Sequence, residues 1–219
     1  MQALATGLQP LGKGLAVSEV NLHTSQGNAP AAERDRTTAG AAAGSALAKR
    51  LLEALGLGAL RQCVYVLAEY DAWLEDRSGF VKLWGITRDL ASAGRFRPTG
   101  LGLLMLNRVM AGDLHRARMT HFPTGADITL SAFHSKAGWS AAMVSAAATP
   151  RDVTIVFPQM PQAVLPRHAL RLVADDSEAT NEQRAEVHIA QEEVVPIGRT
   201  IQVRLPAWGF VVLLPSGET

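Results

Sequence analysis

The hydrophobic pattern of the chain changes close to Gly112, and this change limits the possible folds more than any other feature. Before that point, apolar residues form continuous runs or a stripe with helical spacing. After it, short segments alternate apolar and polar residues, with turn-forming residues between them. Continuous runs suit strands buried on both faces, whereas alternation suits antiparallel strands with one covered face. The pattern therefore predicts two parts, residues 1–112 and residues 113–219.

The first part is predicted to contain a strand, a helix and a second strand. These elements are expected at 15–21, 39–57 and 63–68, followed by a further helix at 101–110. Strand, helix and parallel strand form the repeating unit of a (β/α) barrel. A closed barrel takes about 250 residues and eight such units. The first part therefore predicts an incomplete segment of a (β/α) barrel.

The second part is predicted to be an antiparallel β-sandwich, because several short strands follow one another at regular spacing. The expected strands are 128–133, 139–146, 153–157, 168–173, 187–189, 200–205 and 208–214. Trp139 and Trp208 fall in these strands and are assigned to the sandwich core. The polar segment 175–184 is predicted to be a solvated loop. The expected fold class is thus α/β plus all-β: a partial barrel followed by a sandwich.

Composition excludes several classes of partner. The 219 residues carry a net charge of +1 with scattered Lys and Arg, which does not favour nucleic-acid binding. No apolar stretch is long enough to span a membrane. Residues 1–10 lack a charged segment followed by an apolar one, so no signal peptide is expected and the localisation stays open.

No metal or cofactor is expected. Cys63 is the single cysteine, which rules out an internal disulfide, and its apolar neighbours predict a buried thiol. The six histidines lack the i, i+4 spacing of helical zinc motifs. The sequence also contains neither a phosphate-binding loop nor a Gly-x-Ser-x-Gly nucleophile motif.

Glu19 is the candidate catalytic residue. It lies near the end of an apolar strand and is followed by Asn21 and His23. A barrel places its active site at the carboxyl ends of its strands. A retaining glycosidase needs a carboxylate nucleophile there, with a second carboxyl group about 5–5.5 Å away as general acid. The structural alternative is a glutamate that simply ends an exposed strand.

Four motifs, in this order along the chain, resemble clan A glycoside hydrolases. Residues 15–21, Leu-Ala-Val-Ser-Glu-Val-Asn, are similar to the seventh barrel strand of families such as 39, 51 and 79. Residues 79–86 resemble the eighth strand, and residues 97–107 a family-39-like start of the last helix. Residues 203–213 are similar to the final strands of the sandwich that follows such barrels. The resemblance implies that Glu19 is the nucleophile and that Asn21, His23 and Trp84 contact a carbohydrate substrate.

The chain departs from this pattern at the general acid. In clan A an Asn-Glu pair after the fourth strand carries it, and no such pair lies in residues 1–112. Asn181-Glu182 falls in the polar loop of the sandwich, and Glu69 and Glu75 do not match the motif. General acid catalysis typically contributes about 10²–10⁴-fold. The isolated chain is therefore expected to have little or no glycosidase activity.

Three hypotheses follow from the sequence. The chain is the C-terminal part of a retaining glycoside hydrolase that acts on a poly- or oligosaccharide. Alternatively, it is a non-catalytic module whose sandwich binds carbohydrate or scaffolds a partner. In the third, it is half of a split enzyme, completed by a missing N-terminal barrel part or by an oligomer partner.

Overall fold

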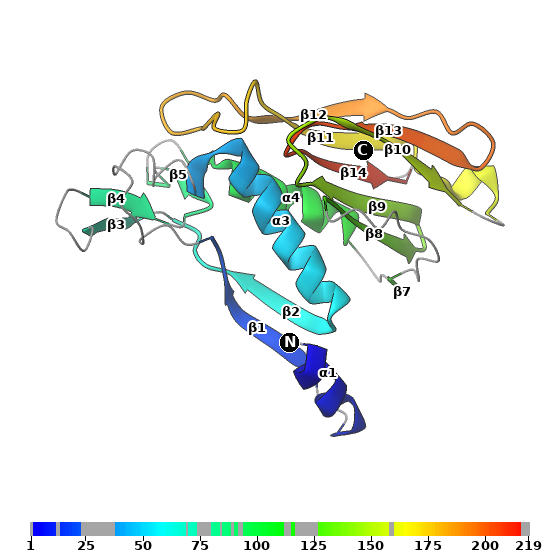
Figure 1. Cartoon of the computed structure of the whole chain (residues 1–219), viewed down its shortest axis with the longest axis horizontal. Helices are drawn as coiled ribbons and strands as arrows, with labels where there is room; N and C mark the ends of the chain where they lie inside the picture. The colour runs from blue at the N-terminus through cyan, green and yellow to red at the C-terminus, as the bar shows by residue number, and fades with distance from the viewer. Residues whose placement is uncertain are drawn as a thin grey trace.

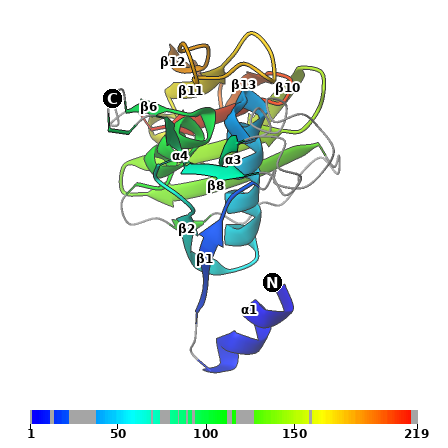
Figure 2. The same cartoon turned by 90° about the vertical axis from the view of Figure 1, so that its left-hand side faces the viewer.

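The computed structural model describes residues 2–11, 14–22, 38–68, 70–73, 80–83, 85–88, 90–91, 94–111, 115–116, 127–157 and 160–215. Its elements form successive layers (Figure 1). A two-stranded sheet lies on one side of two helices, and two antiparallel sheets lie on the other side (Figures 1 and 2). No described helix combines the length and apolar character needed to cross a membrane.

The predicted strand–helix–strand unit is confirmed. Strand β1 (Leu15–Val20) leads through helix α3 (Ala41–Gly56) to strand β2 (Ala59–Val64), and β1 pairs with β2 in parallel. Helix α1 (Gln2–Leu8) and the 3₁₀ helix η1 (Gln9–Leu11) precede this unit. Val20 and Val64 pack against the core that contains α3, and Gln62 Nε2 donates to Leu51 O of α3 at 2.9 Å. One face of the parallel pair is therefore turned to the helix.

Helix α4 (Pro98–Val109) crosses α3 at close range. Pro98 occupies the first turn of α4, where its fixed φ and missing N–H are tolerated. The crossing depends on glycine. A Cβ on Gly102 would lie 2.9 Å from Gly44 O, and a Cβ on Gly44 would overlap Pro98 O. Two helix backbones approach this closely only where side chains are absent.

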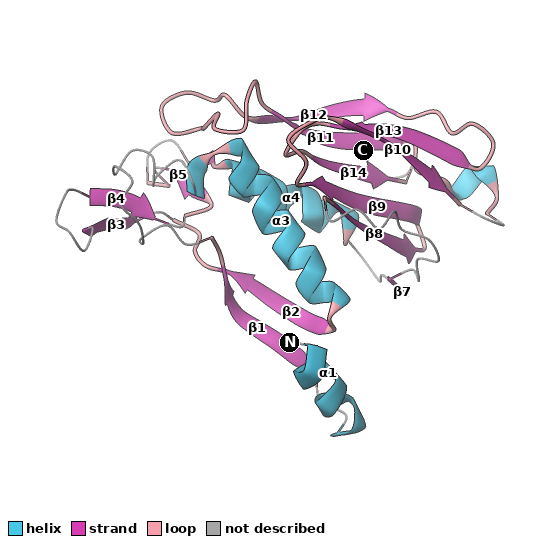
Figure 3. Ribbon diagram, in the orientation of Figure 1, coloured by secondary structure: helices cyan, strands magenta, loops and turns pink. Residues whose placement is uncertain are grey.

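Among the described residues, four short strands lie between β2 and α4. They form two antiparallel pairs: β3 (Tyr70–Trp73) with β4 (Phe80–Leu83), and β5 (Thr87–Arg88) with β6 (Arg95–Phe96). This differs from the expectation that residues 79–86 form the barrel strand after β1. The neighbour of β1 is β2, and Phe80–Leu83 belongs to a hairpin (Figure 3). Phe80–Leu83 pairs with Tyr70–Trp73, a strand that is close to it in the sequence.

The main sheet has six strands in the order β12-β11-β14-β9-β8-β7, and its described pairings are antiparallel. Its strands are β7 (His115–Arg116), β8 (Ile128–Ser135), β9 (Gly138–Ser145), β11 (His168–Val173), β12 (His188–Glu193) and β14 (Phe210–Leu214). Strands β10 (Arg151–Val156) and β13 (Thr200–Leu205) form a separate antiparallel pair, and η2 (Gln162–Val164) connects β10 to β11. These strands confirm a sandwich.

Strand β14 shows how the layers are held together, because all five of its residues are buried. Phe210, Val212 and Leu214 belong to the core shared with α3 and α4. Val211 and Leu213 belong to the opposite core, which contains residues of β10 and β13. Successive side chains of a strand point to opposite faces, so one apolar strand serves both cores. The helices of the first predicted part thus share a core with the main sheet.

Candidate active site

Glu19 lies on an exposed face near the carboxyl end of β1. Leu15, Val17 and Val20 are half-buried, whereas Ser18 and Glu19 are both exposed. The alternation fails because the register slips: Val17 pairs with Gln62, yet Val20 pairs with Val64. Such an irregularity redirects side chains, and it is common at barrel rims and beside active sites. It allows two successive side chains, Glu19 among them, to reach solvent.

The exposed side of the parallel pair continues on β2 and just beyond it. We call it the open face; it consists of Ala16, Ser18, Glu19, Arg61, Cys63, Tyr65 and Leu67, all of which are exposed. Tyr65 is 38% exposed and Leu67 54%. The prediction of a buried Cys63 thiol is therefore wrong. The apolar run was interpreted as a strand covered on both faces, but α3 covers only one.

Asn21 fastens the carboxyl ends of the two parallel strands. Its Nδ2 donates to Tyr65 O, and its Oδ1 accepts a hydrogen bond from Leu22 N at 2.7 Å. Tyr65 N in turn donates to Val20 O at 3.1 Å. Asn21 thus lies close in sequence and space to Glu19, with its amide engaged by backbone groups. This arrangement positions the chain on which Glu19 is carried.

Two further residues were expected at the site, His23 and Trp84. His23 and Trp84 lie outside the described residues, as do Glu69 and Glu75. The structure therefore brings together Glu19 and Asn21 from the predicted set.

The backbone beyond β2 continues towards β5. Ile86 N donates to Val66 O at 2.9 Å and Thr87 N to Leu67 O at 3.0 Å. The Thr87 hydroxyl adds a second hydrogen bond to Leu67 O at 2.6 Å. Ala68 and Thr87 form a parallel bridge. The carboxyl end of β2 is thereby tied to the segment that leads into α4.

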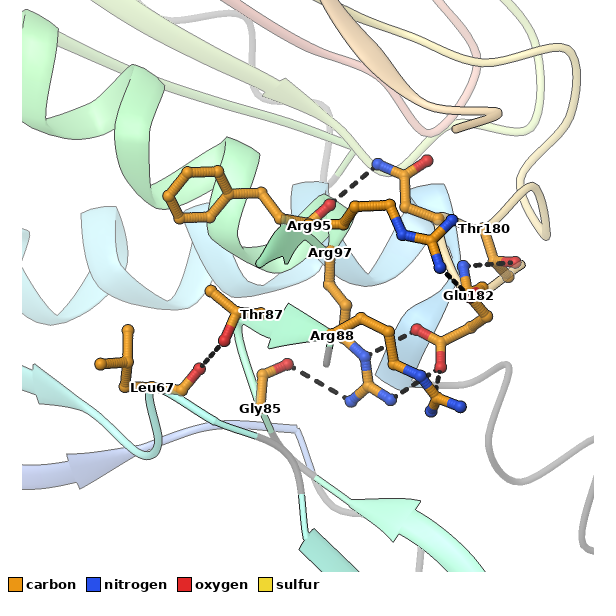
Figure 4. A network of polar contacts seen from close by, with 10 residues as sticks. Leu67, Gly85, Thr87, Arg88, Arg95, Arg97, Thr180 and Glu182 are labelled. Atoms are coloured by element: carbon orange, nitrogen blue, oxygen red, sulfur yellow. Dashed lines mark hydrogen bonds and ion pairs between the residues drawn. The ribbon is translucent and has the colours of Figure 1, made fainter. Parts of the chain in front are cut away.

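Arg97 and Glu182 form a clamp between that segment and the sandwich (Figure 4). Arg97 is 0% exposed, and its Nε and Nη2 meet the two Glu182 oxygens at 2.7 and 3.0 Å. Arg88 Nη1 reaches Glu182 Oε2 at 2.6 Å, and Arg95 Nη2 donates to Glu182 O at 3.0 Å. A planar guanidinium matches a carboxylate in this two-bond geometry.

The prediction that 175–184 is a solvated loop is wrong at its centre. Asn181 is only 4% exposed, and its Nδ2 donates to Phe96 O at 2.9 Å. Its Oδ1 accepts hydrogen bonds from Glu186 N and Val187 N. Glu182 is committed to the arginines, so the Asn181-Glu182 pair serves as a structural contact. At the exposed end of the loop, a hydrogen bond from Arg184 to Glu186 raises the pKa of Arg184.

The two sandwich tryptophans differ. Trp139 is half-buried, packs against the core between the sheets, and donates from Nε1 to Met160 Sδ at 3.1 Å. Trp208 is 42% exposed and lies in the turn before β14, so its assignment to the core is wrong. The turn closes with a hydrogen bond from Gly209 N to Pro206 O at 3.1 Å. This turn was not predicted from the sequence, although the turn-forming residues Pro206 and Gly209 were a signal for it.

The described residues offer no arrangement of three or more His, Cys, Asp or Glu side chains that could hold a metal ion. The chemistry available at the open face is that of a solvent-exposed carboxylate near the end of a parallel strand.

No protein-family model matches the sequence, and no curated protein matches it either. Solved glycoside hydrolases share the fold. A family 30 subfamily 8 xylanase from Clostridium acetobutylicum matches with a TM-score of 0.64 at 11% identity, over 96% of this chain and 44% of the xylanase. A family 51 α-L-arabinofuranosidase from Thermotoga petrophila matches with a TM-score of 0.66 at 12% identity, over 97% of this chain and 45% of that enzyme.

An endo-β-1,6-glucanase matches with a TM-score of 0.55 at 12% identity, over 97% of this chain and 37% of the glucanase. The chain thus spans less than half the length of these three structures. They support the fold of clan A glycoside hydrolases and do not single out family 39.

Proposed function

We propose that this chain is the C-terminal part of a retaining glycoside hydrolase, with Glu19 as its nucleophile. The observation that carries the proposal is the position of Glu19: a register slip exposes it near the carboxyl end of a parallel strand. Barrel enzymes place their catalytic residues at this end. The fold shared with xylanases and an arabinofuranosidase supports carbohydrate as the substrate class.

In this proposal, the Glu19 carboxylate attacks the anomeric carbon and forms a glycosyl ester, while the bond to the leaving group breaks. Water then hydrolyses the ester and regenerates Glu19. A second carboxyl group about 5–5.5 Å away protonates the leaving group in the first step and activates the water in the second. Glu182 is unsuited to this role, because it is bound to Arg97 and Arg88.

We further propose that additional βα units cover the open face except at its carboxyl end, where Glu19 lies, and that these units carry the general acid. The exposed side chains of Cys63, Tyr65 and Leu67 on a two-stranded parallel sheet favour such a partner, because parallel sheets are normally covered on both faces. The units come from another segment or from another chain.

The test uses substrates that differ in whether the leaving group needs a general acid, so that the role of the nucleophile can be measured alone. Dinitrophenolate leaves without protonation, so a chain with a nucleophile alone is expected to release it. We expect purified chain to release dinitrophenolate from 2,4-dinitrophenyl β-xyloside or α-L-arabinofuranoside in a burst, and to act about 10²–10⁴-fold more slowly on the unactivated methyl glycosides.

Glu19→Gln is expected to abolish the burst, and mass spectrometry of the stalled wild-type chain should find the sugar on the peptide that contains Glu19. Glu193→Gln, which removes an exposed carboxylate from β12, is the matched control and should retain the burst. Release that survives Glu19→Gln removes Glu19 from the mechanism. Polysaccharide binding without release from any activated glycoside supports the non-catalytic module instead.

A further inference from the structure

A small hollow lies between the first half of α3 and the end of β9. Its volume is ≈180 Å³. The side chains that matter for its chemistry are Ser45, Lys49, Arg50, Val144, Ser145 and Trp208. Its described lining includes no residue of β1 or β2. Its chemistry is therefore independent of Glu19.

Trp208 forms an exposed aromatic wall of this hollow. Its backbone φ is +49°, a left-handed conformation that disfavours residues with a Cβ. The backbone is held there by Trp208 N, which donates to Ala147 O at 2.9 Å, and by the turn from Pro206 to Gly209. Glycine or asparagine would suit this conformation better. Folding alone therefore does not explain a large aromatic residue that is 42% exposed at this position.

Ser45 lines the hollow and carries a buried hydroxyl at its wall. The residue is 3% exposed, and its hydroxyl has no hydrogen-bond partner among the described residues. A buried hydroxyl without a partner is unfavourable and uncommon. A ligand hydroxyl in the hollow would provide the missing partner.

Lys49 and Arg50 give the hollow positive charge. Both pair with the same carboxylate: Lys49 Nζ lies 3.9 Å from Glu53 Oε1, and Arg50 Nη1 lies 3.0 Å from Glu53 Oε2. Two cations share one anion, so these three groups leave an excess of one positive charge. An anionic ligand group would balance it.

We propose that this hollow binds one acidic residue of a carbohydrate chain. The sugar ring lies on the face of Trp208, a ring hydroxyl bonds to Ser45, and the carboxylate meets Lys49 and Arg50. Sugars present an apolar face to aromatic rings, and a carboxylate forms charge-assisted hydrogen bonds with Lys and Arg. The volume is below the ~300–1,000 Å³ of sites that enclose a whole ligand. The rest of the carbohydrate chain therefore lies in solvent.

Calorimetric titration of the full chain tests the proposal. The probes are trigalacturonate and a xylotetraose that carries one glucuronic acid; galactotriose and xylotetraose are their neutral counterparts. At least one acidic probe is expected to bind about tenfold more tightly than its neutral counterpart, because a charge-assisted hydrogen bond is worth more than a neutral one. Added salt should reduce this preference, because the cations are near the surface.

Three variants locate the site. Lys49→Gln combined with Arg50→Gln should remove the preference for the acidic probe. Trp208→Gly should weaken binding of the acidic probe about tenfold with little change in melting temperature, because glycine adopts the left-handed backbone without strain. Arg204→Gln removes an exposed cation from the β10–β13 pair and should leave binding unchanged. The proposal is overturned if neither acidic probe binds, or if Trp208→Gly binds as tightly as the unaltered chain.

Discussion

The main sheet and the β1–β2 pair are both sheets beside the same helices, yet they are covered differently. Helices cover one face of the main sheet and the β10–β13 pair covers the other, so that all five residues of β14 are buried. The β1–β2 pair has α3 on one face and an open face on the other, where Leu67 is 54% exposed. The apolar faces of the sandwich and its helices are thus buried against one another. The parallel pair, in contrast, keeps one face exposed, where additional βα units could pack.

This difference matters for function because stability requires buried side chains, whereas substrate binding requires accessible ones. A side chain that packs between layers stabilises the fold but cannot reach a substrate. Glu19 lies on the exposed face of the parallel pair. The ion pair of Arg97 and Glu182 lies in the part of the structure whose layers bury one another. The following experiments test that contrast.

The largest effect is expected from Phe210→Ala. Phe210 is 0% exposed in the core between the main sheet and the helices, and loss of a buried phenyl ring typically costs about 3–5 kcal/mol in the free energy of unfolding. Urea denaturation followed by circular dichroism measures it. Tyr65→Ala, an aromatic truncation on the open face, should cost below about 1 kcal/mol. Equal losses would contradict the contrast between the two regions.

Glu182→Ala should cause the second-largest loss in the free energy of unfolding. It leaves the buried Arg97 guanidinium without its carboxylate, and breaking such a pair is expected to cost about 2–4 kcal/mol, because Glu182 is 15% exposed and partly screened. Denaturation curves give the value. Glu192→Ala breaks a surface pair with Arg171 and should cost about 0–1 kcal/mol. If both variants lose the same stability, the clamp does not hold the two parts together.

Gly44→Ala should have an intermediate effect. The new Cβ would overlap Pro98 O of α4, so the helices must separate, at a cost of about 1–3 kcal/mol. The same change at Gly7 of α1 meets nothing within 4 Å and should be neutral or stabilising by up to about 1 kcal/mol, since alanine favours helix. Thermal melts of the two variants should therefore shift in opposite directions or differ clearly in size. A stable Gly44→Ala variant would show that the helices tolerate a wider crossing.

The smallest effect is expected from Leu67→Lys. This residue is exposed on the open face, and surface substitutions usually change stability by less than about 0.5 kcal/mol. Denaturation of the isolated chain measures this. A loss of several times that size would mean that the open face is packed within this chain, and it would argue against additional βα units at that surface.

The sequence predicted those parts of the fold that depend on local pattern. The strand–helix–strand unit and the strands of the sandwich follow from apolar runs and alternation. The strand β2 is Ala59–Val64, whereas the prediction was 63–68. The prediction was displaced because Arg61 and Gln62 interrupt the apolar residues of the strand. Gln62 is accommodated because its amide bonds to Leu51 O of α3, a contact that no local pattern encodes.

At the candidate site, too, the local sequence predicted some features and not others. Glu19 could be selected from its place in a strand, whereas its exposure depends on a register slip against β2. Glu182 was assigned to a solvated loop because its neighbours are polar, and its partner Arg97 lies 85 residues away in the sequence. Trp208 was assigned to a strand, although Pro206 and Gly209 place it in a turn. Contacts between distant segments decide the environments of Glu19 and Glu182, whereas a local turn decides that of Trp208.

The position of β14 has a consequence for the order of events during folding. β14 lies between β11 and β9 in the main sheet, although it follows both of them along the chain. Until residues 210–214 have been synthesised, β9 and β11 each present an unpaired edge, and the two halves of the sheet have no strand to join them. Unpaired edges are sites of aggregation. A nascent chain that pauses before β14 is therefore expected to need protection by a chaperone until this last strand arrives and joins the two halves.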